Sequence, residues 1–331
     1  MERRRLGRSG LLVTRMGLGL AALGRPGYIN LGHHEDLERN YDVAVMEARA
    51  HGVLDAAWNA GIRYFDAARS YGRAEPFLAS WLARRRIQPP EITIGSKWGY
   101  TYTANWQVQA EHHEIKEHSL AVLRRQLAES RGWLGDHLNL YQIHSATLES
   151  DVLENEAVLV ELAALQAQGV RIGLSLSGAR QAETLRRALD VTIDGRRLFD
   201  AVQATWNLLE PSAGIILAQA RAAGMGVIVK EALANGRLTP RNNDPTFRAK
   251  AALLQTIAAE RETTIDAIAL AAVLAQPWAD VVLSGAARAS HLRDNVAALD
   301  VAWDEALARR LADLAEPPDV YWRVRGQLAW N

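Results

Sequence analysis

The feature that most constrains the fold is an alternation of short apolar runs with helix-like segments along nearly the whole chain. Between the runs, apolar residues recur at three- and four-residue steps, as at Leu120, Leu123 and Leu127, which predicts helices. The runs are short and continuously apolar, as strands are when helices cover a parallel sheet. We predict eight strands, at residues 17–20, 62–66, 92–97, 138–144, 171–176, 200–204, 226–230 and 280–285.

Eight strand-and-helix units predict a closed (β/α)8 TIM barrel more than an open, doubly wound sheet. The chain has 331 residues, and barrels of this size fold as one unit, so we expect residues 1–331 to form a single domain. Before the first strand, the segment GRSG can turn between RRRL and LLVTRM, which predicts an N-terminal β-hairpin. Gly61, Gly169 and Gly224 follow helical stretches, where a left-handed C-cap is expected.

Two segments do not fit this repeat. Residues 25–42 form a long connection after the first strand, and residues 317–331 form a tail rich in Trp and Tyr. Long connections in compact domains are usually functional or disordered. Both segments are therefore of interest for function.

The composition excludes several classes of function. Lys plus Arg and Asp plus Glu both number 38, which argues against nucleic acid and acidic membranes as partners. The chain has no cysteine, so disulfides, thiolate metal sites and cysteine nucleophiles are excluded. The apolar N-terminal stretch is interrupted by Thr14 and Arg15, so we expect neither a signal peptide nor a membrane span, and a cytoplasmic protein.

Polar side chains at the ends of neighbouring strands are the candidates for chemistry, because catalytic residues in such barrels follow the strands. Asp66 ends the second predicted strand and Tyr71 follows it, Lys97 ends the third strand, and His144 ends the fourth. Each residue alone has an ordinary structural explanation, as a cap, a packed ring, a solvated cation or a buried histidine. Together they predict an acid-base device.

In this device Tyr71 would protonate a carbonyl oxygen that His144 orients. A phenol has an ordinary pKa of about 10, and an adjacent ammonium favours the phenolate. We therefore expect Lys97 to lower the pKa of Tyr71, and Asp66 to hold Lys97 charged and oriented.

The blocks YFDAARSYG, IGSK and LYQIH resemble the three catalytic blocks of the aldo-keto reductases. The likeness continues in order along almost the whole chain, through RRLGRSGLLVTRMGLGL, GLSLS, VQATWNLLEP, GVIVKEALANGRLT and VVLSGAARASHLRDN. It implies a barrel enzyme in which Asp66, Tyr71, Lys97 and His144 are catalytic and a nicotinamide cofactor is bound without a Rossmann domain. GLGL at residues 17–20 is accordingly not a glycine fingerprint of the dinucleotide-binding kind.

The resemblance also implies the residues that bind the cofactor. Ser175 and Gln203 match positions that hydrogen-bond the nicotinamide carboxamide, and the backbone near Leu233 matches part of the pyrophosphate site. Arg288 is the candidate partner of a 2′-phosphate, which favours NADP(H) and leaves NAD(H) open. The full set is Gly19, Leu20, Ser175, Gln203, Lys230, Glu231, Leu233, Gly285, Ala286, Arg288, His291, Asp294 and Asn295.

The chain departs from the family pattern at several of these positions. Leu20 and Ala21 stand where Thr and Trp are frequent. Lys230, followed by Glu231, stands where many relatives have an aromatic residue that stacks on the nicotinamide. A lysine cannot stack in this way, and its charge would oppose oxidised nicotinamide unless Glu231 pairs with it. Whether Lys230 lines the cofactor site or turns away is left open by the sequence.

Aromatic residues in the loops favour a pocket for a small carbonyl compound or a sugar. Tyr28, Trp98 and Trp322 are the candidates for substrate binding, although aromatic side chains in these segments could equally pack the outer barrel. The alternative function is a cofactor-binding regulatory subunit with little turnover. A metal-dependent hydrolase lacks a ligand set, because the histidine pairs at 33–34 and 112–113 do not end strands.

Overall fold

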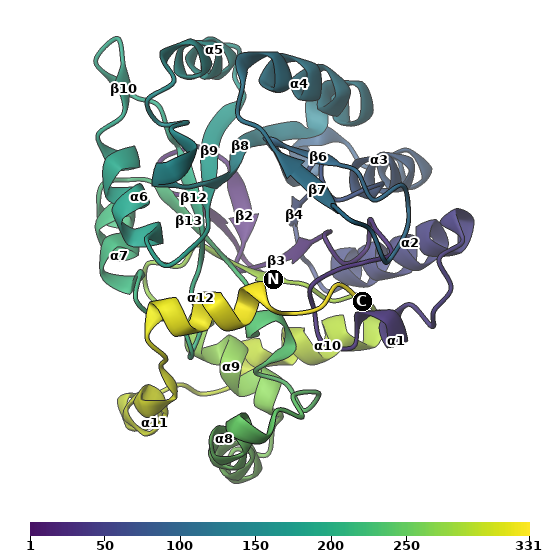
Figure 1. Cartoon of the computed structure of the whole chain (residues 1–331), viewed down its shortest axis with the longest axis vertical. Helices are drawn as coiled ribbons and strands as arrows, with labels where there is room; N and C mark the ends of the chain where they lie inside the picture. The colour runs from purple at the N-terminus through teal and green to yellow at the C-terminus, as the bar shows by residue number, and fades with distance from the viewer.

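A closed barrel of eight parallel strands forms the centre of the molecule (Figure 1). The computed structural model describes all 331 residues. Strand β14 pairs with β3 and closes the ring. All eight predicted strands are confirmed, with ends that shift by a few residues: β3 (Met16–Gly19), β4 (Tyr64–Asp66), β5 (Thr93–Trp98), β8 (Leu138–Ala146), β9 (Arg171–Leu176), β12 (Ala201–Thr205), β13 (Gly226–Lys230) and β14 (Val281–Ser284).

Helices cover the outside of the barrel. The apolar faces of these helices and the outward side chains of the strands form the main core. Three of these helices begin at a polar N-cap residue, Ser119, Asn155 or Thr264, whose side chain accepts a hydrogen bond from a backbone N–H of the first turn of the helix. The larger helices are α2 (Val43–Asn59), α3 (Ala74–Arg85), α4 (Leu120–Leu134), α5 (Glu156–Ala167), α6 (Gln181–Leu189), α7 (Gly214–Ala222), α8 (Arg248–Glu260), α9 (Ile265–Leu274), α10 (Ala289–Ala297) and α11 (Glu305–Leu311).

The expected hairpin is present at the N-terminal end of the barrel. Strands β1 (Arg3–Arg5) and β2 (Leu12–Thr14) pair antiparallel, and Leu6 packs with interior residues of the barrel such as Tyr64 and Ile228. Gly7 approaches so closely that a Cβ atom there would lie 2.4 Å from the backbone nitrogen of Gly226. The hairpin covers this end of the barrel, and the main cavity lies at the opposite end.

Three additions surround the open end of the barrel. A short helix, α1 (His33–Asp36), lies within the long connection; a hairpin of β6 (Tyr100–Tyr102) and β7 (Glu114–Lys116) follows β5; and α12 (Pro318–Gly326) crosses the opening (Figure 1). The two unusual segments of the sequence therefore meet over the barrel. The small strands β10 (Thr192–Ile193) and β11 (Arg196–Arg197) form a separate hairpin.

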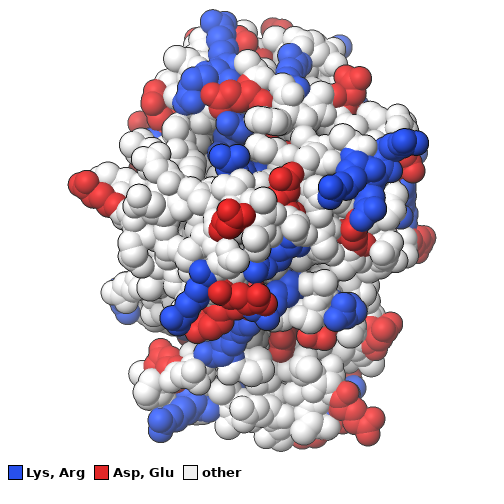
Figure 2. Space-filling model, turned by 90° about the vertical axis from the view of Figure 1, so that its right-hand side faces the viewer, with Lys and Arg blue, Asp and Glu red and all other residues white.

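Charged side chains of both signs are mixed on the face drawn in Figure 2. Blue and red residues lie next to each other there, and neither sign forms a broad tract. None of the helices is both long and apolar enough to cross a membrane. The histidine pairs at 33–34 and 112–113 do not belong to any group of three or more potential metal ligands.

Candidate functional site

A cavity of about 600 Å³ opens at the C-terminal ends of the barrel strands. This volume lies in the range of small-molecule and cofactor sites, roughly 300–1,000 Å³. The cavity runs from the ends of β4 and β8 to the start of α10. Most of the site residues predicted from sequence line it: Gly19, Tyr28, Asp66, Tyr71, His144, Gln203, Lys230, Glu231, Leu233, Gly285, Ala286, His291, Asp294 and Asn295.

The predicted acid-base residues meet at the floor of this cavity. Lys97 is fully buried, and its ammonium forms an ion pair with Asp66. The same Nζ donates to the carbonyl of Ala67 at 3.0 Å and to the Tyr71 hydroxyl at 3.3 Å. The proximity of Asp66, Lys97 and Tyr71 that the strand ends predicted is thus present.

Further donors hold the Asp66 carboxylate inside the barrel. Its Oδ1 accepts from Gln203 Nε2 at 2.8 Å and from Tyr64 and Gln142 at 3.3 Å each. These donors satisfy the buried oxygens of the carboxyl group. The amide of Gln203, expected to meet a cofactor, is therefore also a structural partner of Asp66.

The pKa of Tyr71 is shifted in the direction opposite to our expectation. Burial raises the pKa of this phenol well above its usual range, and Asp66 raises it further, while Arg25 opposes the shift. The expected lowering is not seen because burial, the largest cause, and the negative charge of Asp66 outweigh the opposing cation. The phenol therefore keeps its proton at neutral pH and is suited to donate it.

His144 is neutral and turned toward the cavity. Burial lowers the pKa of its imidazole well below the usual range, and Lys97 and Arg25 lower it further. The ring contacts Tyr71 edge-on with centroids 5.5 Å apart, and its Nδ1 lies 3.4 Å from Ser70 Oγ. A neutral imidazole retains one N–H, which can donate to a carbonyl oxygen next to Tyr71.

Arg25 is a site residue that sequence reasoning missed. The residue is 3% exposed, and its guanidinium carbon lies 5.3 Å from the ring centroid of Tyr71, 5.2 Å from that of Tyr28 and 4.8 Å from that of Trp330. It also pairs with Glu114 of β7 at 2.9 Å. Its partners are far apart in the chain, so no local signal identified it.

A second charged group lies where β13 ends. Lys230 remains at the cavity, where it donates to Thr205 Oγ1 at 2.8 Å and lies 3.6 Å from the Glu231 carboxylate. Glu231 also accepts from Arg325 of α12 at 2.6 Å. Glu231 thus pairs with Lys230, as a lysine beside oxidised nicotinamide would need.

The pKa shifts in this cluster follow its charges. Burial lowers the pKa of Lys230 to about 8, only partly offset by Glu231. Burial acts to raise the pKa of Glu231, but Arg325 and Lys230 outweigh it and bring the value to about 2. Glu231 is strongly ionised because it has two cations, whereas Lys230 shares a single anion with Arg325.

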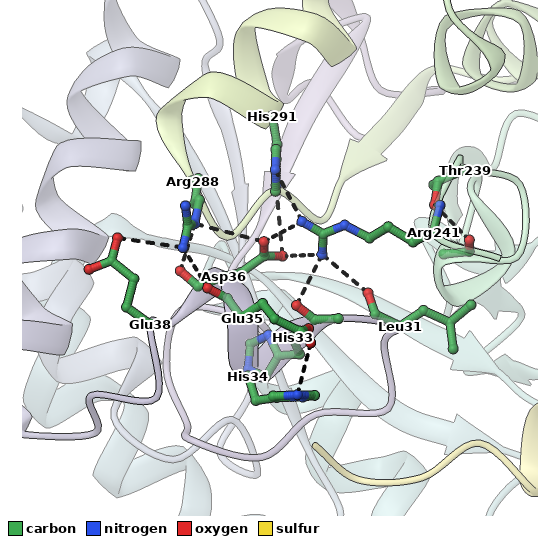
Figure 3. Close-up of polar contacts among 12 residues, drawn as sticks. Leu31, His33, His34, Glu35, Asp36, Glu38, Thr239, Arg241, Arg288 and His291 are labelled. Atoms are coloured by element: carbon green, nitrogen blue, oxygen red, sulfur yellow. Dashed lines mark hydrogen bonds and ion pairs between the residues drawn. The ribbon is translucent and has the colours of Figure 1, made fainter. Parts of the chain in front are cut away.

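The far end of the cavity is formed by the first turns of α10 and by α1 (Figure 3). Asn295 donates to Ser284 Oγ at 2.9 Å, and His291 and Asp294 line the cavity. Arg288 does not line it. Its guanidinium donates instead to the backbone carbonyls of Glu35 and Asp36.

Some predicted site residues lie behind the cavity wall. Leu20 is buried in the core, and Ser175 accepts a hydrogen bond from the backbone of Ser145 at 2.8 Å. Trp98 is also buried in the core rather than at the cavity, because it follows Lys97 in β5 and successive strand residues point to opposite sides. Trp322 packs against Tyr321 and over Lys230, and it does not line the cavity.

Comparison with known proteins identifies the family of the chain. A model of the Aldo/keto reductase family matches residues 15–316, and the chain belongs to this family. It is 26% identical to an uncharacterized oxidoreductase of Bacillus subtilis, YrpG, over 97% of this chain and 99% of that protein. It is 25% identical to the NADH-specific methylglyoxal reductase of Escherichia coli, over 96% of this chain and 99% of that protein.

A solved structure supports the fold. The holo form of aldo-keto reductase AKR11C1 from Bacillus halodurans aligns with a TM-score of 0.73 and 21% identity, over 96% of this chain and 97% of that one. The chain is therefore a (β/α)8 barrel of the aldo-keto reductase type. Its oxidoreductase relatives support carbonyl reduction as the class of reaction.

Proposed function

We propose that this protein reduces a small aldehyde or ketone, or oxidises the corresponding alcohol or aldose, with NAD(P)(H) as cofactor. The observation that carries the proposal is the contact between the Tyr71 hydroxyl and Lys97 beside a neutral His144, at the floor of a cavity. A protonated phenol and a neutral imidazole are both donors toward one carbonyl oxygen. Such an arrangement stabilises the negative charge that develops there.

The cavity has the features that a nicotinamide dinucleotide needs. Gln203 and Lys230 lie near the catalytic residues, the loop from Leu233 to Gly236 lies in the middle, and the N-terminal turn of α10 lies at the far end. Asn235 in this loop has a buried Oδ1 without a hydrogen-bond partner, and Gly285 leaves open space where a side chain would stand. We infer that these residues hold the cofactor.

Four side chains of the cavity floor have a part in the proposed reaction. A bound reduced nicotinamide would supply a hydride to the carbonyl carbon. His144 donates its N–H to the carbonyl oxygen and orients it, and Tyr71 transfers the phenolic proton to the same oxygen. Lys97, held by Asp66, stabilises the phenolate that remains.

The proposed substrate is a small polar carbonyl compound. The cavity near Tyr71 is lined by Tyr28, Tyr100 and Trp330 together with the paired charges of Arg25 and Glu114. Aromatic rings bind the carbon skeleton, while the charged groups bind hydroxyl or carbonyl oxygens. This wall fits a sugar or a short oxygenated aldehyde better than a long apolar chain.

The test is a Tyr71→Phe variant in a spectroscopic assay of NADH and NADPH oxidation against aldehydes, ketones and aldoses. Loss of one general acid predicts a fall in turnover of roughly 10²–10⁴-fold, with nucleotide binding retained. Tyr102→Phe is the matched control, because its hydroxyl accepts from Trp106 on the β6–β7 hairpin and does not line the cavity. Unchanged turnover in Tyr71→Phe would refute the assigned acid.

A further inference from the structure

One carboxylate is surrounded by cationic side chains at the far end of the cavity (Figure 3). Asp36, in α1, has a side chain only 4% exposed. Its Oδ2 accepts from Arg241 Nη1 at 2.8 Å and lies 3.8 Å from His291 Nδ1. The second Nη of Arg241 donates to Oδ1, so the arginine binds the carboxylate through both of its nitrogens.

The arginine that a 2′-phosphate would need is engaged with the same segment. Arg288 Nε donates to the Asp36 carbonyl at 2.8 Å and lies 3.8 Å from Asp36 Oδ1. Its Nη2 donates to the Glu35 carbonyl and lies 3.5 Å from Glu38. The guanidinium is therefore directed at residues 35–38 and away from the cavity lining.

The charge of the surrounding wall has the same sign as a phosphate. Asp36, Asp266 and Asp294 line this end of the cavity, and Arg241 is the permanent cation among the lining residues there. Asp36 already neutralises that arginine. A phosphate monoester carries about 1.5–2 negative charges at neutral pH, so it would meet a net negative wall.

The segment that carries Asp36 is fixed from two sides. Asn331 Oδ1 accepts from the backbone N–H of His33 at 2.8 Å and of His34 at 3.3 Å. Arg241 donates to the carbonyls of Leu31 at 3.2 Å and Gly32 at 3.0 Å. Asp36 is consequently held in place before a nucleotide arrives, and moving it would break its two hydrogen bonds with Arg241.

We infer that Asp36 is a specificity-determining residue that selects NAD(H) over NADP(H), by accepting a hydrogen bond from a ribose 2′-hydroxyl and repelling a 2′-phosphate. The inference rests on the proposed function, because it assumes that a nicotinamide dinucleotide binds in this cavity. A carboxylate is suited to bind a free ribose hydroxyl, whereas guanidinium groups are suited to bind a 2′-phosphate. It replaces the NADP(H) preference that Arg288 favoured in the sequence.

The experiment measures dissociation constants for NADH and NADPH on the full chain, by quenching of tryptophan fluorescence. Wild type is expected to bind NADH at least ten-fold more tightly than NADPH. In Asp36→Asn and Asp36→Ser we expect this ratio to fall at least ten-fold, mainly because NADPH binds more tightly. Glu35→Gln is the matched control, since this neighbouring acid is 60% exposed and lies outside the lining, so the ratio should stay within two-fold.

The outcomes separate this inference from the proposed function. If both nucleotides bind but wild type prefers NADPH, or the ratio does not change in the Asp36 variants, the selectivity role is overturned while the reductase proposal stands. If neither nucleotide binds, both are overturned. Should the variants fail to fold, a competition experiment on the wild-type protein replaces them. We expect 5′-AMP to compete with NADH more strongly than 2′,5′-ADP does. The reverse order would refute the inference.

Discussion

Replacing Glu231 by glutamine is expected to destabilise the protein by about 3 kcal/mol at pH 7. The carboxylate is only 7% exposed, accepts from Arg325 at 2.6 Å and lies 3.6 Å from Lys230. Its pKa of about 2 lies some two and a half units below that of a free glutamate, and each unit corresponds to about 1.4 kcal/mol. Removal of one member of a buried ion pair costs about 3–5 kcal/mol in other proteins. The lower end applies here because Arg325 is 25% exposed.

The sign of the pH dependence follows from the lowered pKa of Glu231. A carboxyl group with a lower pKa in the folded state stabilises the protein fully above the pKa of the unfolded chain, and this stabilisation is lost as the pH falls toward about 2. The difference between wild type and Glu231→Gln should therefore be largest at neutral pH. It should narrow steadily below about pH 4.5, where the carboxyl of the unfolded chain is protonated.

The assay is equilibrium unfolding in urea without nucleotide, followed by tryptophan fluorescence and by far-ultraviolet circular dichroism. Coincident curves from the two probes justify a single free energy of unfolding. Glu161→Gln is the control, because it breaks a more exposed pair with Arg124 and should change the midpoint little. A loss below about 1 kcal/mol for Glu231→Gln at pH 7 would contradict the cost that we assign to unpaired buried cations.

Two further predictions concern the reaction itself. Arg25→Gln should raise the pKa of Tyr71 further, because the positive charge of Arg25 opposes the upward shift. We therefore expect slower turnover and an alkaline limb of the pH profile of kcat that moves to higher pH. An unchanged profile would show that Arg25 only packs against the ring. The pKa of His144 lies well below its usual range, so its imidazole stays neutral around neutral pH and kcat should show no inflection near pH 6.5. An inflection there that disappears in His144→Asn would contradict the neutral assignment.

The barrel could be predicted from sequence because its strands are local patterns. Each strand is a short apolar run, and the glycines expected to end helices do take positive φ values, 87° at Gly61 and 94° at Gly224. The ends were less predictable. Strand β8 continues to Ala146, past the expected end at His144, because Ala146 pairs again with β9 after an irregularity at Ser145, which has a φ of 52°.

The proximity of Asp66, Lys97 and Tyr71 was predictable for a related reason, since parallel strands bring their ends together. The position of Trp98 could also have been derived, because a residue next to an inward-pointing Lys97 must point outward. The contacts of Arg25 and Asp36 could not be predicted from the sequence. Arg25 depends on Glu114 and Trp330, and Asp36 depends on Arg241 and His291, so neither environment exists until distant segments have folded together.

The hydrogen bonds of α1 also have a consequence for the order of folding. The segment around His33 is made early in synthesis, yet the residues that fix it, Arg241, Arg288 and Asn331, follow about 200 to 300 positions later. Contacts with so large a sequence separation form late, because the intervening chain must be ordered first. The far end of the cavity around Asp36 therefore becomes ordered only after residues 241–331 have joined the fold, at the same stage as the pairing of β14 with β3 that closes the barrel.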